Sequence, residues 1–323
     1  MPPTKLTTPL ALLVPAEPLT RFSFAPFGDV IENPHPDVLP PAAAAAPLPP
    51  AVSASFSAVP ANQGTAIKYQ RVSRPLDLYP QAPSRAPGAP VVSLFSCAAR
   101  ALEPARPAAG SAPPISTLLP YATYAGPERA GRFRLRVLER HPFTTQTFVP
   151  LAAAAAVHAA AYLVVVAPTL ASGRETEEEE EAALFPAPAT GGKGPGMPDL
   201  ARLRAFVAYP GQAVTYGAGT WHAPMVALGP QGTAVDFVVT QFASGVAAED
   251  CQEVELEPAS EGAGVVVQVP ERMPPASKLL YDERLDMPVD VIWSSIRHVR
   301  RGVVGQSGPI AQYAAHGIGS CKV

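Results

Sequence analysis

The chain has 323 residues, a formal net charge of −3 and 41 prolines. This length accommodates one large domain with additions, or two small domains. The mildly acidic balance lacks the basic character of nucleic-acid-binding proteins, so we expect no nucleic-acid partner. Because proline interrupts helices and central strands, much of the chain should form turns, loops or disordered linkers.

The three cysteines, Cys97, Cys251 and Cys321, are spread along the chain without a Cys-x-x-Cys or Cys/His zinc spacing. A sparse and odd number of cysteines is typical of free thiols in a reducing compartment. We therefore expect a cytoplasmic protein whose thiols are buried rather than catalytic.

The candidate for a membrane span is the apolar stretch at residues 148–167. It contains Pro150 and His158, and its many alanines favour hydrocarbon only weakly. We predict an Ala-rich loop followed by a strand at residues 161–167, and no membrane association.

Three segments have a low-complexity composition. Residues 34–60 and 104–114 are rich in Pro and Ala, and residues 171–198 combine a run of five glutamates with Gly and Pro. Such segments bury little apolar surface, so we predict disordered insertions. Residues 1–260 are otherwise predicted to form one domain, and residues 261–323 a C-terminal extension of unknown role.

Short β-type runs separated by Gly/Pro turns make up the rest of the domain, and long helical periodicity is nearly absent. This pattern predicts an all-β sandwich or barrel with few short helices. One helical turn is expected at residues 198–204, capped by Asp199. The predicted strands lie within residues 91–97, 132–140, 145–151, 161–167, 203–209, 212–219 and 233–242.

The run at residues 132–140 ends in polar residues that a strand buries only at a cost. Alternation predicts Glu139 and His141 on the same face as Phe133 and Leu135, with Arg140 pointing outward. A buried carboxylate or imidazole needs a partner, and a single histidine in a strand is usually a core residue that has one.

This run and a later stretch resemble the two motifs of the cupin superfamily. Glu139, His141 and Gln146 occupy the frame of the first motif, His-x-His followed four residues later by Glu. Gly219 and His222 fit the Gly-x-x-His of the second, which follows a Pro-Gly turn. The resemblance implies a cupin-like barrel of the double-stranded β-helix or jelly-roll type, in which these four polar side chains converge.

Two departures from the cupin motif bear on metal binding. Glu139 stands where the motif has His, and Gln146 where it has Glu. Two imidazoles, a carboxylate and an amide hold a divalent ion less tightly than three imidazoles and a carboxylate. A divalent-metal site made by Glu139, His141, Gln146 and His222 therefore remains one alternative, and a metal-free site the other.

A closer resemblance extends over residues 20–257. The stretches "FSFAPFGDVIE", "NQGTAIKY", "LERHPFTTQTFVP", "YLVVVA", "GTWHAPM", "VDFVVTQF" and "EDCQEVEL" occur in this order. Together they resemble the ureidoglycolate lyase family of allantoin catabolism. The resemblance implies cleavage of ureidoglycolate into glyoxylate and urea, and a homodimer. Bacterial members commonly have a second His where this chain has Ala223.

The implied reaction removes a carbinol proton, protonates a departing nitrogen and requires a cation for the carboxylate. Histidine suits the proton transfers because its pKa lies near neutral pH, so His141 and His222 are the candidates. Lys68 and Tyr69 resemble the family's basic–aromatic pair, usually Arg-Tyr, and are expected to bind the substrate.

Tyr216 and Asp236 are further candidates for substrate binding. Core filling is the alternative for Tyr216, and a structural ion pair is the alternative for Asp236. Two other functions also remain open, a metal-dependent cupin enzyme such as a dioxygenase and a non-catalytic cupin-like binding protein. The Glu and Gln replacements count against the first.

Overall fold

The computed structural model describes residues 4–9, 11–40, 47–103, 131–151, 161–171, 185–209 and 211–270. The predicted insertion at 104–114, the Ala-rich loop at 152–160 and most of the C-terminal extension lie outside these residues. Within the described residues, no helix is long and apolar enough to cross a membrane.

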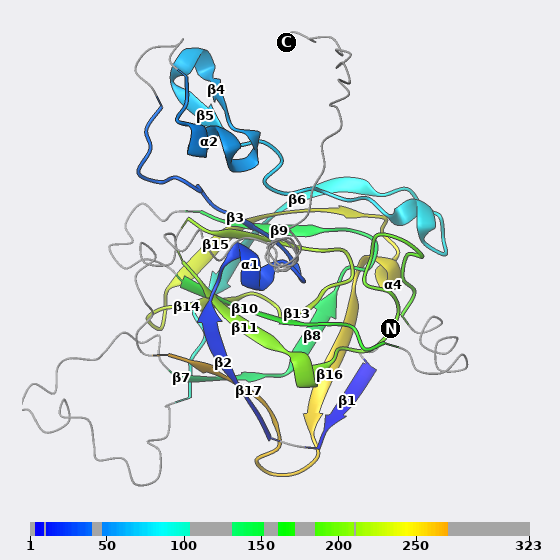
Figure 1. Cartoon of the computed structure of the whole chain (residues 1–323). Helices are drawn as coiled ribbons and strands as arrows, with labels where there is room; N and C mark the ends of the chain where they lie inside the picture. Colours follow the sequence, from blue (N-terminus) through cyan, green and yellow to red (C-terminus); the bar gives the residue numbers. More distant parts are fainter. Residues whose placement is uncertain are drawn as a thin grey trace, which may run out of the picture. The chain divides into compact units, whose positions relative to one another are not determined.

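The described residues form mainly curled β-sheets, which confirms the expected all-β fold (Figure 1). The ten-stranded sheet contains, in spatial order, β1 (Thr4–Thr8), β16 (Gln252–Pro258), β8 (Val137–Arg140), β13 (Trp221–His222), β10 (Ala161–Ala167), β11 (Arg204–Ala208), β2 (Ala11–Pro18), β17 (Gly264–Val269) and β7 (Gly131–Leu135), with β14 (Val226–Leu228) also paired to β10. The five-stranded sheet contains β3 (Gly28–Ile31), β12 (Ala213–Tyr216), β9 (Gln146–Pro150), β15 (Ala234–Ala243) and β6 (Ala89–Ala98).

The remaining described elements are short. Strands β4 (Val59–Ala61) and β5 (Ala66–Lys68) form a separate hairpin. The helices are α1 (Arg21–Phe24), α2 (Pro50–Ala54) and α4 (Ala247–Asp250), with 3₁₀ turns η1 (Ser55–Ser57), η2 (Asn62–Gly64), η3 (Tyr79–Gln81) and η5 (Leu200–Arg202). The η5 turn confirms the predicted helical turn, because the Asp199 side chain accepts a hydrogen bond from the Ala201 amide.

Strand β10 separates two hydrophobic cores. Leu163 and Val165 belong to core A, which is formed within the ten-stranded sheet and its adjoining segments. Tyr162 and Val164 belong to core B, which contains side chains from both sheets. Because both faces of β10 are buried, its sequence is continuously apolar rather than alternating.

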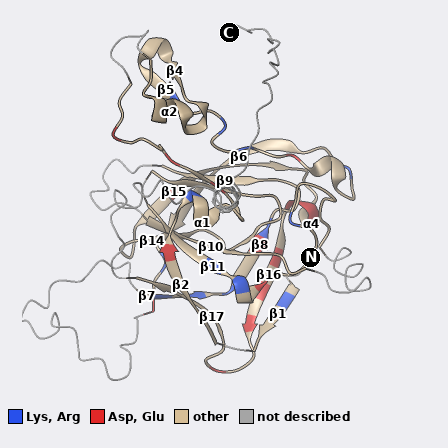
Figure 2. Cartoon of the chain, viewed as in Figure 1, with Lys and Arg blue, Asp and Glu red and all other residues tan. Residues whose placement is uncertain are grey.

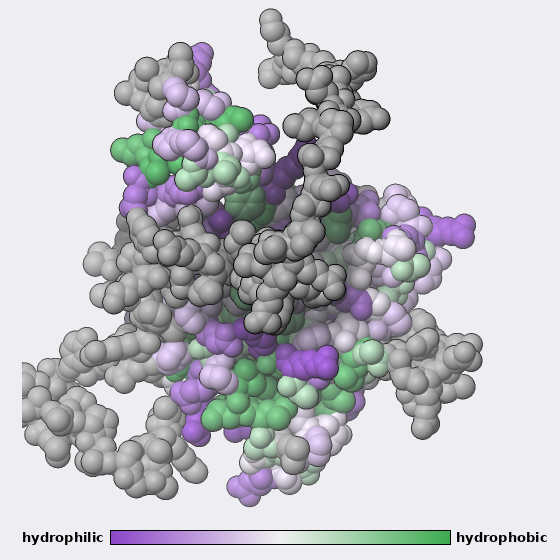
Figure 3. Space-filling view, in the orientation of Figure 1, coloured by the Kyte–Doolittle hydropathy of each residue, from purple (hydrophilic) through white to green (hydrophobic). Residues whose placement is uncertain are grey.

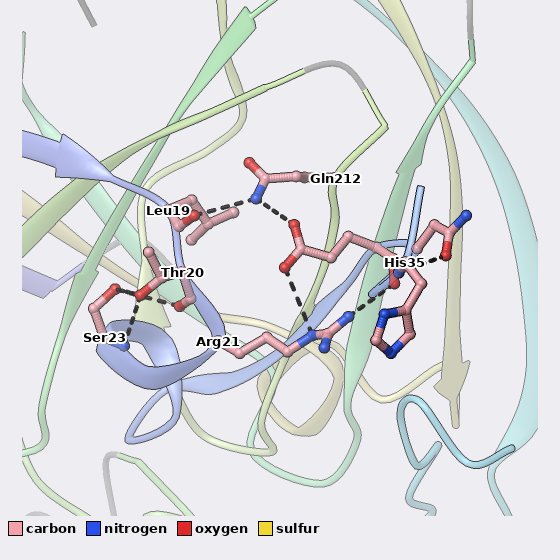
Figure 4. A network of polar contacts seen from close by, with 8 residues as sticks. Leu19, Thr20, Arg21, Ser23, His35 and Gln212 are labelled. Carbon is pink, nitrogen blue, oxygen red and sulfur yellow. Dashed lines mark hydrogen bonds and ion pairs between the residues drawn. The ribbon is translucent and has the colours of Figure 1, made fainter. Parts of the chain in front are cut away.

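A polar network ties α1 to β3 and to the turn before β12 (Figure 4). Thr20 caps α1 by accepting a hydrogen bond from the Ser23 amide. Arg21 donates to the Glu32 backbone carbonyl at 2.8 Å. The Gln212 amide donates to both the Leu19 carbonyl and the Glu32 carboxylate, so the network fixes the start of the five-stranded sheet.

Charged and apolar residues are distributed unevenly over the surface. Acidic residues alternate with apolar residues along β16 (Figure 2), and Lys5 on the neighbouring β1 pairs with Glu257 at 2.6 Å. In the view of Figure 3, apolar residues gather over β2 and β17, where Leu13 is 58% exposed.

Parts of two predicted insertions are ordered. Within residues 34–60, Leu48, Val52 and Ala58 form a small apolar cluster that supports α2, η1 and β4. Within residues 171–198, the part from Phe185 onward packs on the ten-stranded sheet, and Phe185 itself is buried in core A. In both segments a few apolar residues pack into a core, although the average composition of the segment indicates disorder.

The predicted boundary at residue 260 falls before the last described strand. Strand β17 pairs in parallel with β2 and antiparallel with β7. Its Val265, Val267 and Val269 side chains are buried in core A. The ten-stranded sheet therefore extends to Val269, and the C-terminal extension begins later than expected.

Candidate active site

Glu139 and Arg140 of β8 do not lie on the faces that alternation counted from Leu135 predicts. Arg136 lies between β7 and β8 and breaks the single strand predicted at residues 132–140. Its carbonyl accepts a hydrogen bond from the Leu256 amide. Leu135 and Leu138 consequently share core A, although strict alternation would separate them. Glu139 therefore does not share a face with Leu135. Arg140, expected to point outward, is fully buried.

His141 lies directly after β8 and is held from two sides. Its backbone carbonyl accepts a hydrogen bond from the Gly219 amide at 2.9 Å. Its Nδ1 lies 2.6 Å from the Asp250 carbonyl oxygen. A carbonyl only accepts hydrogen bonds, so Nδ1 carries the proton and Nε2 presents an unprotonated lone pair.

The turn at residues 217–220 presents His222 beside His141. Gly219 has a φ of +79°, and a Cβ there would lie 3.1 Å from the Lys193 amide nitrogen, so glycine fits best. The Nδ1 of His222 donates to the Thr220 carbonyl at 2.9 Å, which again leaves Nε2 unprotonated. Tyr216 stacks on the His222 ring with centroids 4.0 Å apart and fixes its plane.

Three of the predicted polar residues come together. The rings of His141 and His222 lie 5.6 Å apart. The Nε2 atom of His222 is 3.6 Å from a Glu139 carboxylate oxygen. One potential ligand atom from each of these three residues lies within 4.8 Å of the others, so the set fits a divalent cation.

Burial controls the protonation of this cluster. Burial, and then the charge of Glu253, raises the pKa of Glu139 to about 7. Burial, and then the neighbouring His141, lowers the pKa of His222 to about 3. Burial also lowers the pKa of His141. At neutral pH both imidazoles are neutral, while Glu139 exists in both protonated and ionised forms.

A cavity of about 570 Å³ opens beside the cluster. Gln146 lines it and donates from Nε2 to the Gln241 side-chain oxygen at 2.7 Å. Three of the buried polar atoms at this site have no hydrogen-bond partner among the described residues, namely Nε2 of His141, Nε2 of His222 and Oε1 of Gln146. Buried polar atoms normally have partners, so these three indicate a site for a ligand.

The cavity contains a cation that the sequence analysis missed. Arg100 lines it, two residues after the end of the edge strand β6. No carboxylate of the described residues forms an ion pair with Arg100. Strand alternation offered no signal, because Arg100 lies three residues after Cys97 and the cavity is lined by consecutive residues from Phe95 to Arg100.

Most of the predicted substrate-binding residues do not contact the cluster of Glu139, His141 and His222. Lys68 is exposed on the β4–β5 hairpin, and Tyr69 packs against the apolar cluster around Val52. Asp236 is exposed on β15 because it alternates with the buried Val235 and Phe237. Among the predicted substrate-binding residues, Tyr216 is the one in contact with the cluster.

The β-rich fold and the two neutral histidines beside a carboxylate define the class of small-molecule cupin-like proteins. The sequence profile of the ureidoglycolate lyase family matches residues 11–261. A ureidoglycolate lyase of Schizosaccharomyces pombe is 33% identical over 75% of this chain and 91% of that protein. The ureidoglycolate lyase of Saccharomyces cerevisiae is 33% identical over 57% of this chain and 69% of its own length. The relative from Burkholderia mallei NCTC 10229 is 28% identical over 69% and 78%, respectively. The chain belongs to the ureidoglycolate lyase family.

Proposed function

We propose that the protein cleaves ureidoglycolate into glyoxylate and urea. Membership of the family supports this activity. The observation that carries the proposal is the pair of buried imidazoles whose Nε2 atoms are unprotonated and have no partner beside the cavity. They lie next to a carboxyl group whose pKa is near 7, so a base and an acid are available at the same pH.

The cleavage requires two proton transfers. An imidazole Nε2, of His141 or His222, takes the proton of the carbinol hydroxyl, whose electron pair forms the aldehyde carbonyl. The carbon–nitrogen bond breaks, and the urea nitrogen receives a proton from the carboxyl group of Glu139. The 3.6 Å separation between Glu139 and His222 then allows the proton to return to the carboxylate.

We assign the binding and orientation of the substrate to side chains that line the cavity. The Arg100 guanidinium is proposed to bind the substrate carboxylate, since it is a cation that lines the cavity. Gln146 is proposed to hydrogen-bond to the ureido group through its unpartnered Oε1. Lys68 remains the family-based alternative for the carboxylate, and it would have to reach the cavity from an exposed hairpin.

The same donors fit a divalent metal ion. Glu139, His141 and His222 would hold it, with Gln146 beside them. A bound cation would lower the pKa of the substrate hydroxyl. The hydrogen bonds from Nδ1 to the carbonyls of Asp250 and Thr220 already fix the tautomers that metal binding requires.

Incubation of the purified protein with ureidoglycolate, with glyoxylate and urea quantified separately, tests the function. Release of both products in equal amounts supports the lyase, and absence of turnover with and without added divalent cations contradicts it. Repeating the assay after chelation decides between the two roles of the histidines. Retained activity supports proton transfer, whereas loss and recovery with one cation supports metal ligation.

We also propose that the enzyme is a cytoplasmic homodimer. The dimer rests on the family resemblance. The cytoplasmic location rests on the free Cys97 and Cys251, which are typical of reducing compartments.

A further inference from the structure

We propose that Arg140 is a positioning residue, which holds the short strand β13 in register with β8 and thereby sets the contact between Glu139 and His222. The inference rests on the proposed function for its kinetic test and on the geometry alone for its spectroscopic test. Arg140 does not line the cavity, so its effect on the reaction would be transmitted through its neighbours.

Backbone pairing holds β13 to β10 through two residue pairs, but to β8 through only one. The strand has only two residues, Trp221 and His222. Its ladder with β8 consists of the single pair of His222 and Glu139. Little backbone pairing therefore fixes the position of β13 relative to β8, and side-chain contacts across these two strands contribute to it.

The cross-strand neighbours on the opposite face supply such contacts. Since His222 is opposite Glu139, the residues next to them, Trp221 and Arg140, also face one another across the two strands. The Arg140 guanidinium lies over the Trp221 ring, 4.5 Å from its centroid. Burial strengthens a cation–π contact of this kind, because water does not compete for the cation.

Arg140 also joins β8 to its other neighbour, β16. Its Nε atom donates to the Gln252 side-chain oxygen at 2.8 Å, and Gln252 is the backbone partner of Arg140 across these strands. One side chain thus contacts both strands that flank β8. The side chain is fully buried, so water does not compete for these bonds.

The segment that begins at Phe185 completes this arrangement. Arg140 donates from Nη1 to the Gly194 carbonyl at 2.9 Å. The Trp221 indole donates to the Gly196 carbonyl at 3.1 Å, and Phe185 packs edge-on against the indole ring. Arg140 and Trp221 therefore bind the same segment, which couples the positions of β8 and β13.

The test uses Arg140→Met, which keeps the length of the side chain and removes the charge and all its donors. The control is Arg204→Met, because Arg204 also stacks on an aromatic ring, that of Phe206, and donates to a side chain and a carbonyl, but does not line the cavity. Both variants are compared with the unsubstituted full chain at temperatures where circular dichroism shows them to be folded.

The first measurement is the nuclear Overhauser effect between the ring protons of His141 and His222. We expect it to weaken in Arg140→Met and to remain unchanged in Arg204→Met. The second is steady-state kinetics with ureidoglycolate, in which Arg140→Met should lower kcat at least tenfold with a smaller change in KM. A role in stability alone would lower the unfolding midpoint and leave both measurements unchanged in the folded protein.

A folded Arg140→Met protein with unchanged ring contacts and unchanged kcat overturns the proposal. If this variant does not fold, Gln252→Met removes the acceptor of the Arg140 Nε and should produce the same changes in smaller measure. Unchanged values in that variant also overturn it. If the unsubstituted protein does not cleave ureidoglycolate, the proposed function fails, and the Overhauser comparison still decides the role of Arg140.

Discussion

Replacement of His222 by Gln should change how the stability of the metal-free protein depends on pH. The pKa of His222 is lowered to about 3 by burial and by the neighbouring His141. In the unfolded chain it returns to about 6.5. The unfolded state therefore binds a proton that the folded state rejects, and the folded state loses stability as the pH falls through 6.5.

The magnitude follows from these two values. At pH 5 the solution is about 1.5 pH units below the unfolded pKa, which corresponds to a loss of about 2 kcal/mol relative to pH 8. Because the folded pKa lies well below pH 5, this figure depends little on its exact value. His222 is fully buried, so solvent does not screen the effect appreciably.

The assay is urea unfolding at pH 8 and pH 5, in chelator, of the unsubstituted protein and His222→Gln. Glu139 has a raised pKa and acts in the opposite direction, and His141 has a lowered pKa. Both are present in the two proteins, so the difference reports His222 together with its coupling to these two neighbours. The unsubstituted protein should lose about 2 kcal/mol more than the variant. Equal losses would mean that His222 titrates normally in the fold and that the site is open to water, contrary to the geometry.

Three further predictions concern other parts of the molecule. Glu139→Gln should lower kcat about a hundredfold with a smaller effect on KM in the glyoxylate assay, since it removes the proposed proton donor; a normal kcat would remove it from the mechanism. Arg100→Met should raise KM about tenfold, because it removes a charge-assisted bond to the substrate carboxylate, whereas Lys68→Met should not; the reverse result would assign the carboxylate to the hairpin. Phe185→Ala should lower the free energy of unfolding by about 3–5 kcal/mol in urea titrations, and Leu39→Ala, at 81% exposure, by less than about 0.5 kcal/mol; equal effects would show that the ordered part of residues 171–198 does not stabilise the fold.

Local patterns predicted some elements closely. The continuous apolar run at residues 161–167 predicts a strand, and the structure confirms it as β10, which is buried on both faces. The capped turn after Asp199 depends on one side chain and one amide a few residues apart. In both cases the residues that determine the structure are neighbours in the sequence, so no long-range contact has to be known.

Other features depend on contacts that the sequence does not display. The break at Arg136 reverses the faces of β8, and it arises from pairing with Leu256, more than a hundred residues away. Motif spacing brought Glu139, His141 and His222 together correctly. Arg100 was missed because it follows an edge strand outside both motifs, where nothing local distinguishes it from other surface arginines.

The motif "ERH" places charged or titratable side chains on both faces of one strand, and the two faces have different tasks. Glu139 faces the cavity, where burial raises its pKa and makes a proton available near pH 7. Arg140 faces the opposite side, where its charge is distributed over an aromatic ring, an amide and backbone carbonyls. A buried arginine is costly unless such partners are already in place. An apolar residue could fill the same space, but its contacts lack direction and would not fix the register of a two-residue strand. The requirement for a defined Glu139–His222 contact therefore provides a physical reason for a buried cation directly behind the site.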